Sequence, residues 1–420
     1  TKHIKLRLTV MNFLQFAVWG AYLTSMGRYL GTAGFGSEIG NFYAMQGLVS
    51  LFMPALMGIV ADRWIPAQRL LGVCHMLAGM LMLGVFLYTQ TDAPSYPSLF
   101  ALYSLSVAFY MPTLALSNSV AYTSLDQAGL DLVKSFPPIR VFGTVGFICT
   151  MIAVSLLGLE ATSGQFAVSA IISLVLAVYA QTLPNCPTAP KGQSKSLVEA
   201  LGLRAFVLFK QRKMALFFIF SMLLGVSLQI TNGFANPFIS TFGEIPAYAD
   251  TFGVKYANIL ISLSQLSETL CILLIPFALR RFGIRRVMLI AMVAWVLRFA
   301  LLGLGNPGSG VWLFLLSMIV YGVAFDFFNV SGSLFVDKET DPSIRSSAQG
   351  LFMIMTNGIG ATLGSLGAQA VINRFVYSQS EATAILSGWT TSWYVFAAYA
   401  AVVAVLFAVL FRYNTATEAK

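Results

Sequence analysis

Long apolar runs alternate with short polar connections along nearly the whole chain. Twelve of these runs are long enough to cross a hydrocarbon layer of about 30 Å as helices, and together they predict an all-α membrane protein. The runs lie at about residues 8–30, 39–60, 68–88, 98–123, 139–158, 162–184, 213–240, 254–280, 286–305, 309–336, 343–371 and 390–412. The spacing changes once, in the middle, which predicts two six-helix bundles over residues 1–184 and 213–420.

The segment between the bundles, residues 185–212, is predicted to be a basic linker. It follows Pro184 and contains Pro187 and Pro190, which do not continue a helix. Residues 196–209 then carry apolar side chains at helical spacing. This pattern predicts an amphipathic helix that lies along the inner surface of the membrane.

The basic residues are distributed unevenly between the connections. The chain is 57% hydrophobic and 10% charged, which excludes an ordinary soluble protein. If the amino terminus is inside, 20 of the 25 lysines and arginines lie in cytoplasmic segments, three lie outside, and Arg140 and Arg298 lie within apolar runs. The bias predicts that the linker and both termini are cytoplasmic. It also explains the net charge of +9 without a nucleic-acid partner.

A loop pattern recurs in the two halves. The second run ends with Gly58, Asp62 and Arg63, and the eighth is followed by a charged turn over residues 279–286. Such a repeat is typical of a duplicated transporter. With twelve runs and a central linker, the chain resembles the major facilitator superfamily. The resemblance implies that Gly58, Asp62 and Arg63 belong to a cytoplasmic gate, although residues 65–67 and Arg280 depart from the common pattern.

An acidic residue, Asp326, lies in the middle of the tenth run. A carboxylate at this depth costs about 2.5 kcal/mol or more, so it is usually retained for function. Phe325, Phe327 and Phe328 beside it suit a ligand that is part ring and part polar. The simpler alternative is that Asp326 only connects two helices. Glu268 is the other acid clearly at membrane depth.

Polar residues recur on single faces of other predicted helices. Gln265 and Glu268 are three residues apart and therefore share a face. The other such faces are Gln229 with Asn232, then Arg140 with Thr144 and Phe147, and finally Asn12 with Gln15, Trp19 and Tyr22. Exposing these groups to lipid would be costly, so we expect them to line a common polar interior. For any single amide, a hydrogen bond between helices is the more ordinary explanation, whereas the aligned faces taken together favour a polar cavity.

Three further features limit the chemistry. Arg140 is expected to hold polar groups of a substrate or to neutralise a carboxylate, with a structural ion pair as the alternative. Arg298 has no aligned polar companions and is interpreted as structural, and His75 as a buried histidine with satisfied hydrogen bonds. No glycine-rich phosphate loop and no metal-ligand spacing occur, so neither ATP, a metal nor another cofactor is expected. Because desolvation favours the protonated form of a carboxyl, a proton can be the coupling ion.

Four segments carry a closer resemblance. Residues 136–147, 228–232, 264–268 and 321–333 resemble those of the bacterial nucleoside:proton symporters. The resemblance implies proton-driven import of nucleosides across the bacterial inner membrane by alternating access. It also implies a nucleoside site lined by Arg140, Thr144, Phe147, Gln229, Asn232, Gln265, Glu268, Tyr321, Phe325 and Asp326. We assign proton coupling to Asp326 and Glu268, with Asp326 favoured because its neighbours are the more apolar.

Three alternatives remain open. A proton-coupled sugar or glycoside carrier would also need acids and amides for hydroxyl groups. An intramembrane aspartyl hydrolase would need two carboxylates that share a proton, and only Glu268 could be the second. A receptor that does not transport could use the same cavity. We expect a carrier that is not an enzyme, embedded in the bilayer and functional as a monomer.

Overall fold

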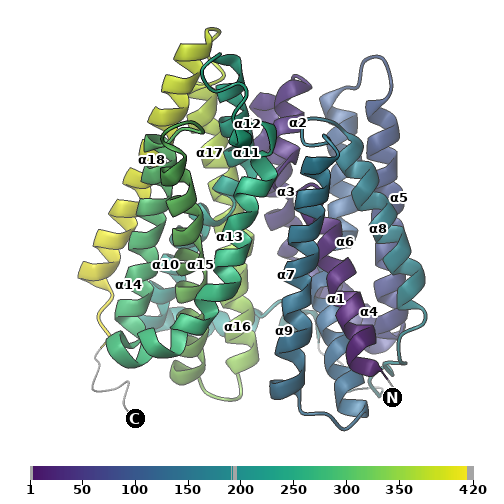
Figure 1. Ribbon diagram of the computed structural model, residues 1–420. Coiled ribbons are helices and arrows are strands. Elements are labelled where there is room, and N and C mark those ends of the chain that lie inside the picture. Colours follow the sequence, from purple (N-terminus) through teal and green to yellow (C-terminus); the bar gives the residue numbers. More distant parts are fainter. Residues whose placement is uncertain (1–2, 191, 193–195, 414–420) are drawn as a thin grey trace. The chain divides into compact units, whose positions relative to one another are not determined.

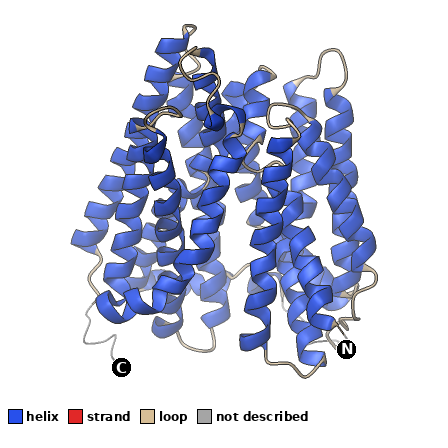
Figure 2. Ribbon diagram, in the orientation of Figure 1, coloured by secondary structure: helices blue, strands red, loops and turns tan. Residues whose placement is uncertain are grey.

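The chain folds into helices joined by turns in the computed structural model, which describes residues 3–190, 192 and 196–413 (Figure 2). These helices form two compact units. The first unit comprises Thr1–Tyr29 and Leu48–Leu201, and the second comprises Leu30–Gly47 and Gly202–Lys420. Both chain ends and part of the linker lie outside the described residues, so their cytoplasmic location stays a prediction. The predicted bundle boundaries at residues 184 and 213 also stay a prediction.

The first unit is built from long apolar helices with recognisable starts (Figure 1). Asp131 caps α7 because its carboxylate accepts a hydrogen bond from the Val133 amide at 3.2 Å. Pro97 stands in the first turn of α6, where no amide donor is needed. The helices are α1 (Ile4–Gly20), α2 (Met26–Thr32), α4 (Met53–Arg63), α5 (Ala67–Thr89), α6 (Tyr96–Gln127), α7 (Leu132–Leu156), α8 (Gly164–Ala180) and α9 (Leu197–Ala200), with α2 extending into the second unit.

Glycines hold α1 and α7 at close range. A Cβ atom added to Gly146 would lie 2.2 Å from the Phe13 carbonyl oxygen. One added to Gly20 would lie 2.4 Å from the carbonyl oxygen of Phe147. Small residues at such positions let helix backbones approach closely within a membrane. The two glycines therefore determine how α7 presents its polar face beside α1.

In the second unit, glycines likewise allow close packing between α10 and the region around α17. A Cβ atom on Gly364 would lie 2.0 Å from the Val226 carbonyl oxygen, and one on Gly225 would lie 2.2 Å from that of Thr356. The elements are η1 (Gly36–Glu38), α3 (Ile39–Ser50), η2 (Leu203–Lys210), α10 (Arg212–Leu228), α11 (Ile230–Thr241), η3 (Phe242–Glu244), α12 (Phe252–Lys255), α13 (Ala257–Cys271), η4 (Ile272–Leu274), α14 (Ile275–Leu304), α15 (Val311–Glu339), α16 (Arg345–Met353), the π-helical η5 (Ile354–Gly360), α17 (Ala361–Phe375) and α18 (Ala382–Leu410), with the end of α3 extending into the first unit.

The apolar runs all lie on helices, but the helices do not match them one to one. Within the described residues, nine helical stretches are long and apolar enough to cross a membrane. The first run is divided between α1 and α2, and the sixth contains only the shorter α8. The eighth and ninth runs join into one stretch that is broken at Gly283, whose φ of 81° is in the left-handed region. The count of twelve membrane helices therefore stays a prediction.

The predicted amphipathic helix over residues 196–209 is wrong as a single helix. The structure has the four-residue α9 and the 3₁₀ segment η2 in its place. Gly202 separates them with a φ of 70°, a left-handed conformation that ends a right-handed helix. Apolar spacing alone does not reveal such a break.

One stretch from the early part of the chain packs within the second unit. The Gly40 amide donates a hydrogen bond to Gln369 Oε1 at 2.5 Å, and Gln369 Nε2 donates to the Gly36 carbonyl at 3.0 Å. A Cβ atom on Gly47 would lie 2.4 Å from Thr362 Oγ1. The segment Leu30–Gly47 thus packs against α17, where glycines allow close contact and the Gln369 side chain forms the hydrogen bonds.

Candidate functional site

In the first unit, the predicted polar face of α7 lies against the aromatic side of α1. The guanidinium carbon of Arg140 lies 4.0 Å from the centre of the Phe16 ring. The buried ring of Phe147 meets Trp19 edge-on, with centroids 6.3 Å apart. Thr144 is half-buried between Arg140 and Phe147 on the same helix. This arrangement places a cation and several ring faces on one side of the unit.

The local sequence of α7 makes room for this cation. Pro137 and Pro138 lie inside the helix just before Arg140, so two backbone donors are missing there. A Cβ atom on Gly143 would lie 2.6 Å from the Phe16 ring and 2.8 Å from Arg140 Nη1. A side chain at residue 143 would thus displace the guanidinium from the ring.

The centre of the first unit is a buried network around His75. Gln15 on α1 contacts His75 Nε2 through Oε1 at 2.7 Å and donates through Nε2 to Thr113 Oγ1 at 2.7 Å. The other ring nitrogen of His75 lies 3.0 Å from Ser173 Oγ on α8. His75 is therefore a buried histidine with satisfied hydrogen bonds, as predicted.

This network corrects the prediction for the helix-one stripe. Asn12 and Gln15 were expected to line a polar cavity, yet both are completely buried within the first unit. Gln15 connects α1 to α5 and α6, and Asn12 Nδ2 donates to the Leu8 carbonyl of its own helix at 3.1 Å. Alignment on one face was not sufficient because that face packs against other helices of the same unit. Trp19, which contacts Tyr110 and Phe147, is the half-buried member of the stripe.

In the second unit, the two predicted polar pairs lie on neighbouring helices. Gln229 stands between α10 and α11, and its Oε1 accepts a hydrogen bond from Asn232 Nδ2 at 2.8 Å. Gln265 and Glu268 are half-buried on α13. Ser267 of the same helix lies against α15, where a Cβ atom on Gly322 would come within 2.4 Å of its hydroxyl. The close approach of α13 and α15 brings Gln265 and Glu268 to the side of α15.

The α15 helix carries the acid and the aromatic pair. Tyr321 and Phe325 are one turn apart, and their rings stack with centroids 5.8 Å apart and an interplanar angle of 21°. Asp326 is 3% exposed, and its Oδ2 atom has no hydrogen-bond partner among the described residues. A buried carboxylate oxygen without a partner is costly, so Asp326 is the most unusual group of this face.

The structure gives Arg298 companions that spacing along the chain did not reveal. Its guanidinium donates to Ser264 Oγ on α13 at 3.2 Å, to Thr231 Oγ1 on α11 at 3.1 Å and to the Ser317 carbonyl on α15 at 3.2 Å. Its guanidinium carbon also lies 4.6 Å from the centre of the Tyr321 ring. Trp295, one turn earlier on α14, meets the same ring edge-on with centroids 5.8 Å apart. Arg298 is therefore structural, as predicted, but it also holds a predicted site residue.

The predicted gate residues lie at the end of α4. Gly58 and Asp62 are half-buried and Arg63 is exposed. The Asp62 carbonyl accepts a hydrogen bond from the Ala189 amide at 2.7 Å, which ties the end of this helix to the linker. Their role as a gate stays a prediction.

The predicted site residues thus form one group in each unit. Arg140, Thr144 and Phe147 lie together on α7, and the other seven lie on or beside α11, α13 and α15. Sequence reasoning missed Phe16, Trp295 and the contacts of Arg298. The available signals were an arginine inside an apolar run and an aromatic pair on α1 three residues apart, Phe16 and Trp19.

Known proteins are similar to this chain over nearly its whole length. The family model described as "Nucleoside H+ symporter" matches residues 2–416. The xanthosine permease of Escherichia coli is 49% identical over 414 residues, which cover 98% of this chain and 96% of the permease. The nucleoside permease NupG of the same organism is 46% identical over 415 residues, or 98% and 97% of the two chains. The crystal structure of nucleoside transporter NupG matches with a TM-score of 0.89 and 44% identity, covering 98% of this chain and all of that one.

Proposed function

The chain belongs to the nucleoside H⁺ symporter family, and we propose that it binds nucleosides through the two groups of residues described above and couples their import to a proton at Asp326. It is a multi-pass transporter of the bacterial inner membrane and not an enzyme. The finer proposal is a monomer with twelve membrane helices in two bundles and with cytoplasmic termini. Alternating access would then proceed by movement of repeated halves.

The observation that carries the proposal is the environment of Asp326. Its side chain is buried, one of its oxygens has no hydrogen-bond partner among the residues that the structure describes, and the stacked rings of Tyr321 and Phe325 precede it on the same helix. A protonated carboxyl at this place can donate a hydrogen bond, whereas an ionised one bears the cost of desolvation. A ligand with both a flat ring and hydroxyl groups would satisfy both features.

Nucleoside chemistry fits the remaining residues. A flat base can stack against an aromatic ring such as that of Phe325. Ribose hydroxyls can donate to Glu268 and accept from the amides of Gln265 and Asn232. A nucleotide would bring a phosphate beside two carboxyl groups, so nucleotides should be poor substrates.

The proposed cycle uses the proton as the coupling ion. Asp326 takes up a proton on the more acidic outer side, which lowers the cost of burying it together with substrate. On the inner side, higher pH and access of water favour ionisation, and the carboxyl then ceases to be a donor to the nucleoside. Substrate and proton leave together.

Transport by the purified protein in proteoliposomes tests this function. We expect a radiolabelled nucleoside to accumulate under an inward proton gradient and to stop accumulating when a protonophore is added. Nucleosides should compete for uptake, whereas free ribose and disaccharides should not. Accumulation that withstands the protonophore would contradict proton coupling, and competition by free sugars would favour a sugar carrier. Binding without counterflow would identify a receptor.

A further inference from the structure

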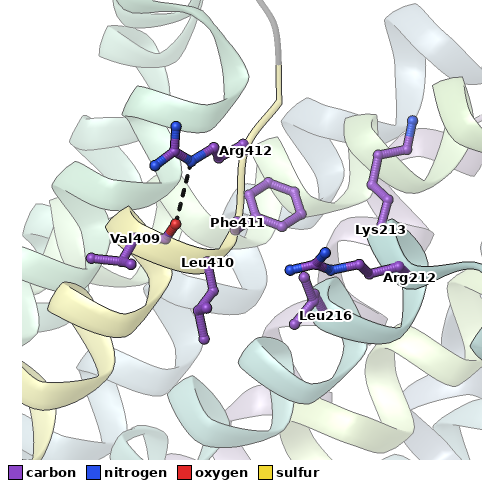
Figure 3. A pocket seen from close by; sticks show the side chains of 7 residues that line it. All are labelled: Arg212, Lys213, Leu216, Val409, Leu410, Phe411 and Arg412. Carbon is purple, nitrogen blue, oxygen red and sulfur yellow. Dashed lines mark hydrogen bonds between the residues drawn. The ribbon is translucent and has the colours of Figure 1, made fainter.

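The second unit has a basic pocket at the ends of two of its long helices, α10 and α18. Its volume is about 350 Å³, and it lies between the start of α10 and the end of α18 (Figure 3). Arg212, Lys213 and Arg412 line it together with apolar side chains that include Leu216 and Leu410. None of these residues belongs to the substrate groups described above.

Two of the three cations in this pocket have no ion-pair partner in the part of the chain that the structure describes. Lys213 pairs with Glu339, and in Figure 3 its side chain extends away from Arg212. Arg212 makes no hydrogen bond or ion pair with the described residues. Arg412 uses Nε for a 3.4 Å hydrogen bond to the Val409 carbonyl, which leaves its terminal nitrogens as donors. Two exposed guanidinium groups thus line one pocket, and neither has an ion-pair partner within residues 3–190, 192 and 196–413.

The end of α18 accounts for only part of these charges, through the single hydrogen bond of Arg412 to Val409. Arg285 already donates to the Ala408 carbonyl at 2.6 Å and to the Phe411 carbonyl at 2.7 Å. It therefore supplies the cation that the carboxyl end of a helix favours. Arg212, in contrast, stands at the amino end of α10, where the helix dipole adds to the positive potential. The pocket is consequently set up for an anion.

The position of the pocket identifies the kind of anion. Both α10 and α18 belong to stretches that are long and apolar enough to span a membrane, and the pocket lies at their polar ends. Leu410 is 41% exposed beside the guanidiniums, so the pocket combines phosphate-binding groups with apolar surface. Guanidinium forks match phosphate oxygens in geometry and charge. A phosphodiester attached to acyl chains offers this same combination.

We propose that this pocket binds the headgroup of an anionic phospholipid, with the phosphodiester on Arg212 and Arg412 and an acyl chain along Leu216 and Leu410. Basic residues at the membrane surface attract anionic lipid, and a pocket converts this general attraction into a defined site. The site lies in the second unit alone. It would therefore exist whatever the transported substrate proves to be.

Native mass spectrometry of the purified full-length protein tests the proposal. We expect one phosphatidylglycerol molecule to be retained per chain, and phosphatidylcholine at the same concentration to be lost. The double variant Arg212→Gln/Arg412→Gln should bind phosphatidylglycerol roughly 30-fold more weakly, because two basic contacts are removed. The matched control is Arg69→Gln/Lys134→Gln, which removes two exposed charges near the starts of α5 and α7 and should bind like the parent.

Three outcomes would overturn the proposal. Equal retention of phosphatidylglycerol by the pocket variant and the control would show that the lipid binds elsewhere. Equal retention of phosphatidylcholine would show that the charge is not recognised. Displacement of the lipid by inorganic phosphate at equal concentration would mean that the acyl chain contributes nothing and that the ligand is a free phosphate. The single variants Arg212→Gln and Arg412→Gln, each expected to weaken binding partly, separate the two guanidiniums.

Discussion

The two units have different polar centres. In the first, His75 on α5 is held between Gln15 and Ser173, and each of its ring nitrogens has a partner. In the second, Arg298 on α14 reaches residues of three other helices and the ring of Tyr321, and its Nε atom has no hydrogen-bond partner among the described residues. The members of the first centre bind one another, whereas the second centre supports a face that carries Asp326, whose Oδ2 atom has no hydrogen-bond partner in the described part of the chain.

The difference indicates that the polar centres of the two units have different roles. A network whose members all satisfy one another stabilises its unit and has little to offer a ligand. A permanent cation that holds an aromatic ring beside a buried acid can influence both substrate and proton. Variants of the second centre should therefore change transport, while variants of the first should mainly change stability.

The largest effect is expected at Asp326. Asp326→Asn removes the titratable group but keeps a similar shape, so uphill accumulation should be abolished while exchange at equal nucleoside concentrations persists. Proteoliposomes with and without a pH gradient provide the measurement. Glu268→Gln, the matched acid on α13, should retain accumulation with weakened substrate binding. If Glu268→Gln loses accumulation and Asp326→Asn keeps it, the two roles are reversed.

The next effect tests the two centres directly. Arg298→Met leaves the polar groups of three helices without their donor, which should cost about 3 kcal/mol of stability and release Tyr321. His75→Gln should cost about 1–2 kcal/mol, since the amide can replace only part of the network. Thermal unfolding and nucleoside titration together provide the test.

The dissociation constant distinguishes the two centres. We expect Arg298→Lys, which keeps the charge, to fold well but to bind nucleoside more weakly because the Tyr321 ring loses its flat partner. His75→Gln should bind normally once folded. An unchanged dissociation constant in Arg298→Lys would reduce Arg298 to a structural role, and the contrast between the units would then disappear.

A smaller effect is expected at the glycines that allow close helix packing in both units. Gly364→Ala should lower stability by about 1–3 kcal/mol, since the new methyl group would meet the Val226 carbonyl at 2.0 Å. Gly146→Ala should do the same in the first unit, at Phe13. The control is Gly367→Ala on α17, where a Cβ atom has no neighbour within 4 Å and the change should be neutral or stabilising. Equal unfolding temperatures for Gly364→Ala and Gly367→Ala would contradict the close packing.

The smallest effect concerns one ring. Phe325→Ala should weaken nucleoside binding because a stacking partner is removed. The loss should be about 0.5–1.5 kcal/mol in addition to the free energy lost with the buried apolar area. Calorimetry on purified protein measures this loss. Phe277→Ala, an exposed phenylalanine on α14, is the matched control and should leave binding unchanged. A similar affinity in both variants would remove Phe325 from the substrate site.

The sequence alone determined the helical character, the membrane location and the two acids at depth. Apolar runs become helices because a backbone in lipid must satisfy its own hydrogen bonds, a requirement that acts within each segment. Asp326 and Glu268 were identifiable for a similar reason, since an acid in an apolar run is costly whatever surrounds it. Motif resemblance then supplied the family, which the comparisons confirmed.

The tertiary structure decided which neighbour each polar side chain meets. Gln15 belongs to the His75 network rather than to a cavity, and Arg298 holds Tyr321, because helices distant in sequence supply the partners. Only the fold brings Arg212 and Arg412 into one pocket. Spacing along one helix shows which residues share a face, but the direction of that face depends on packing against other helices, and that information lies in several segments at once.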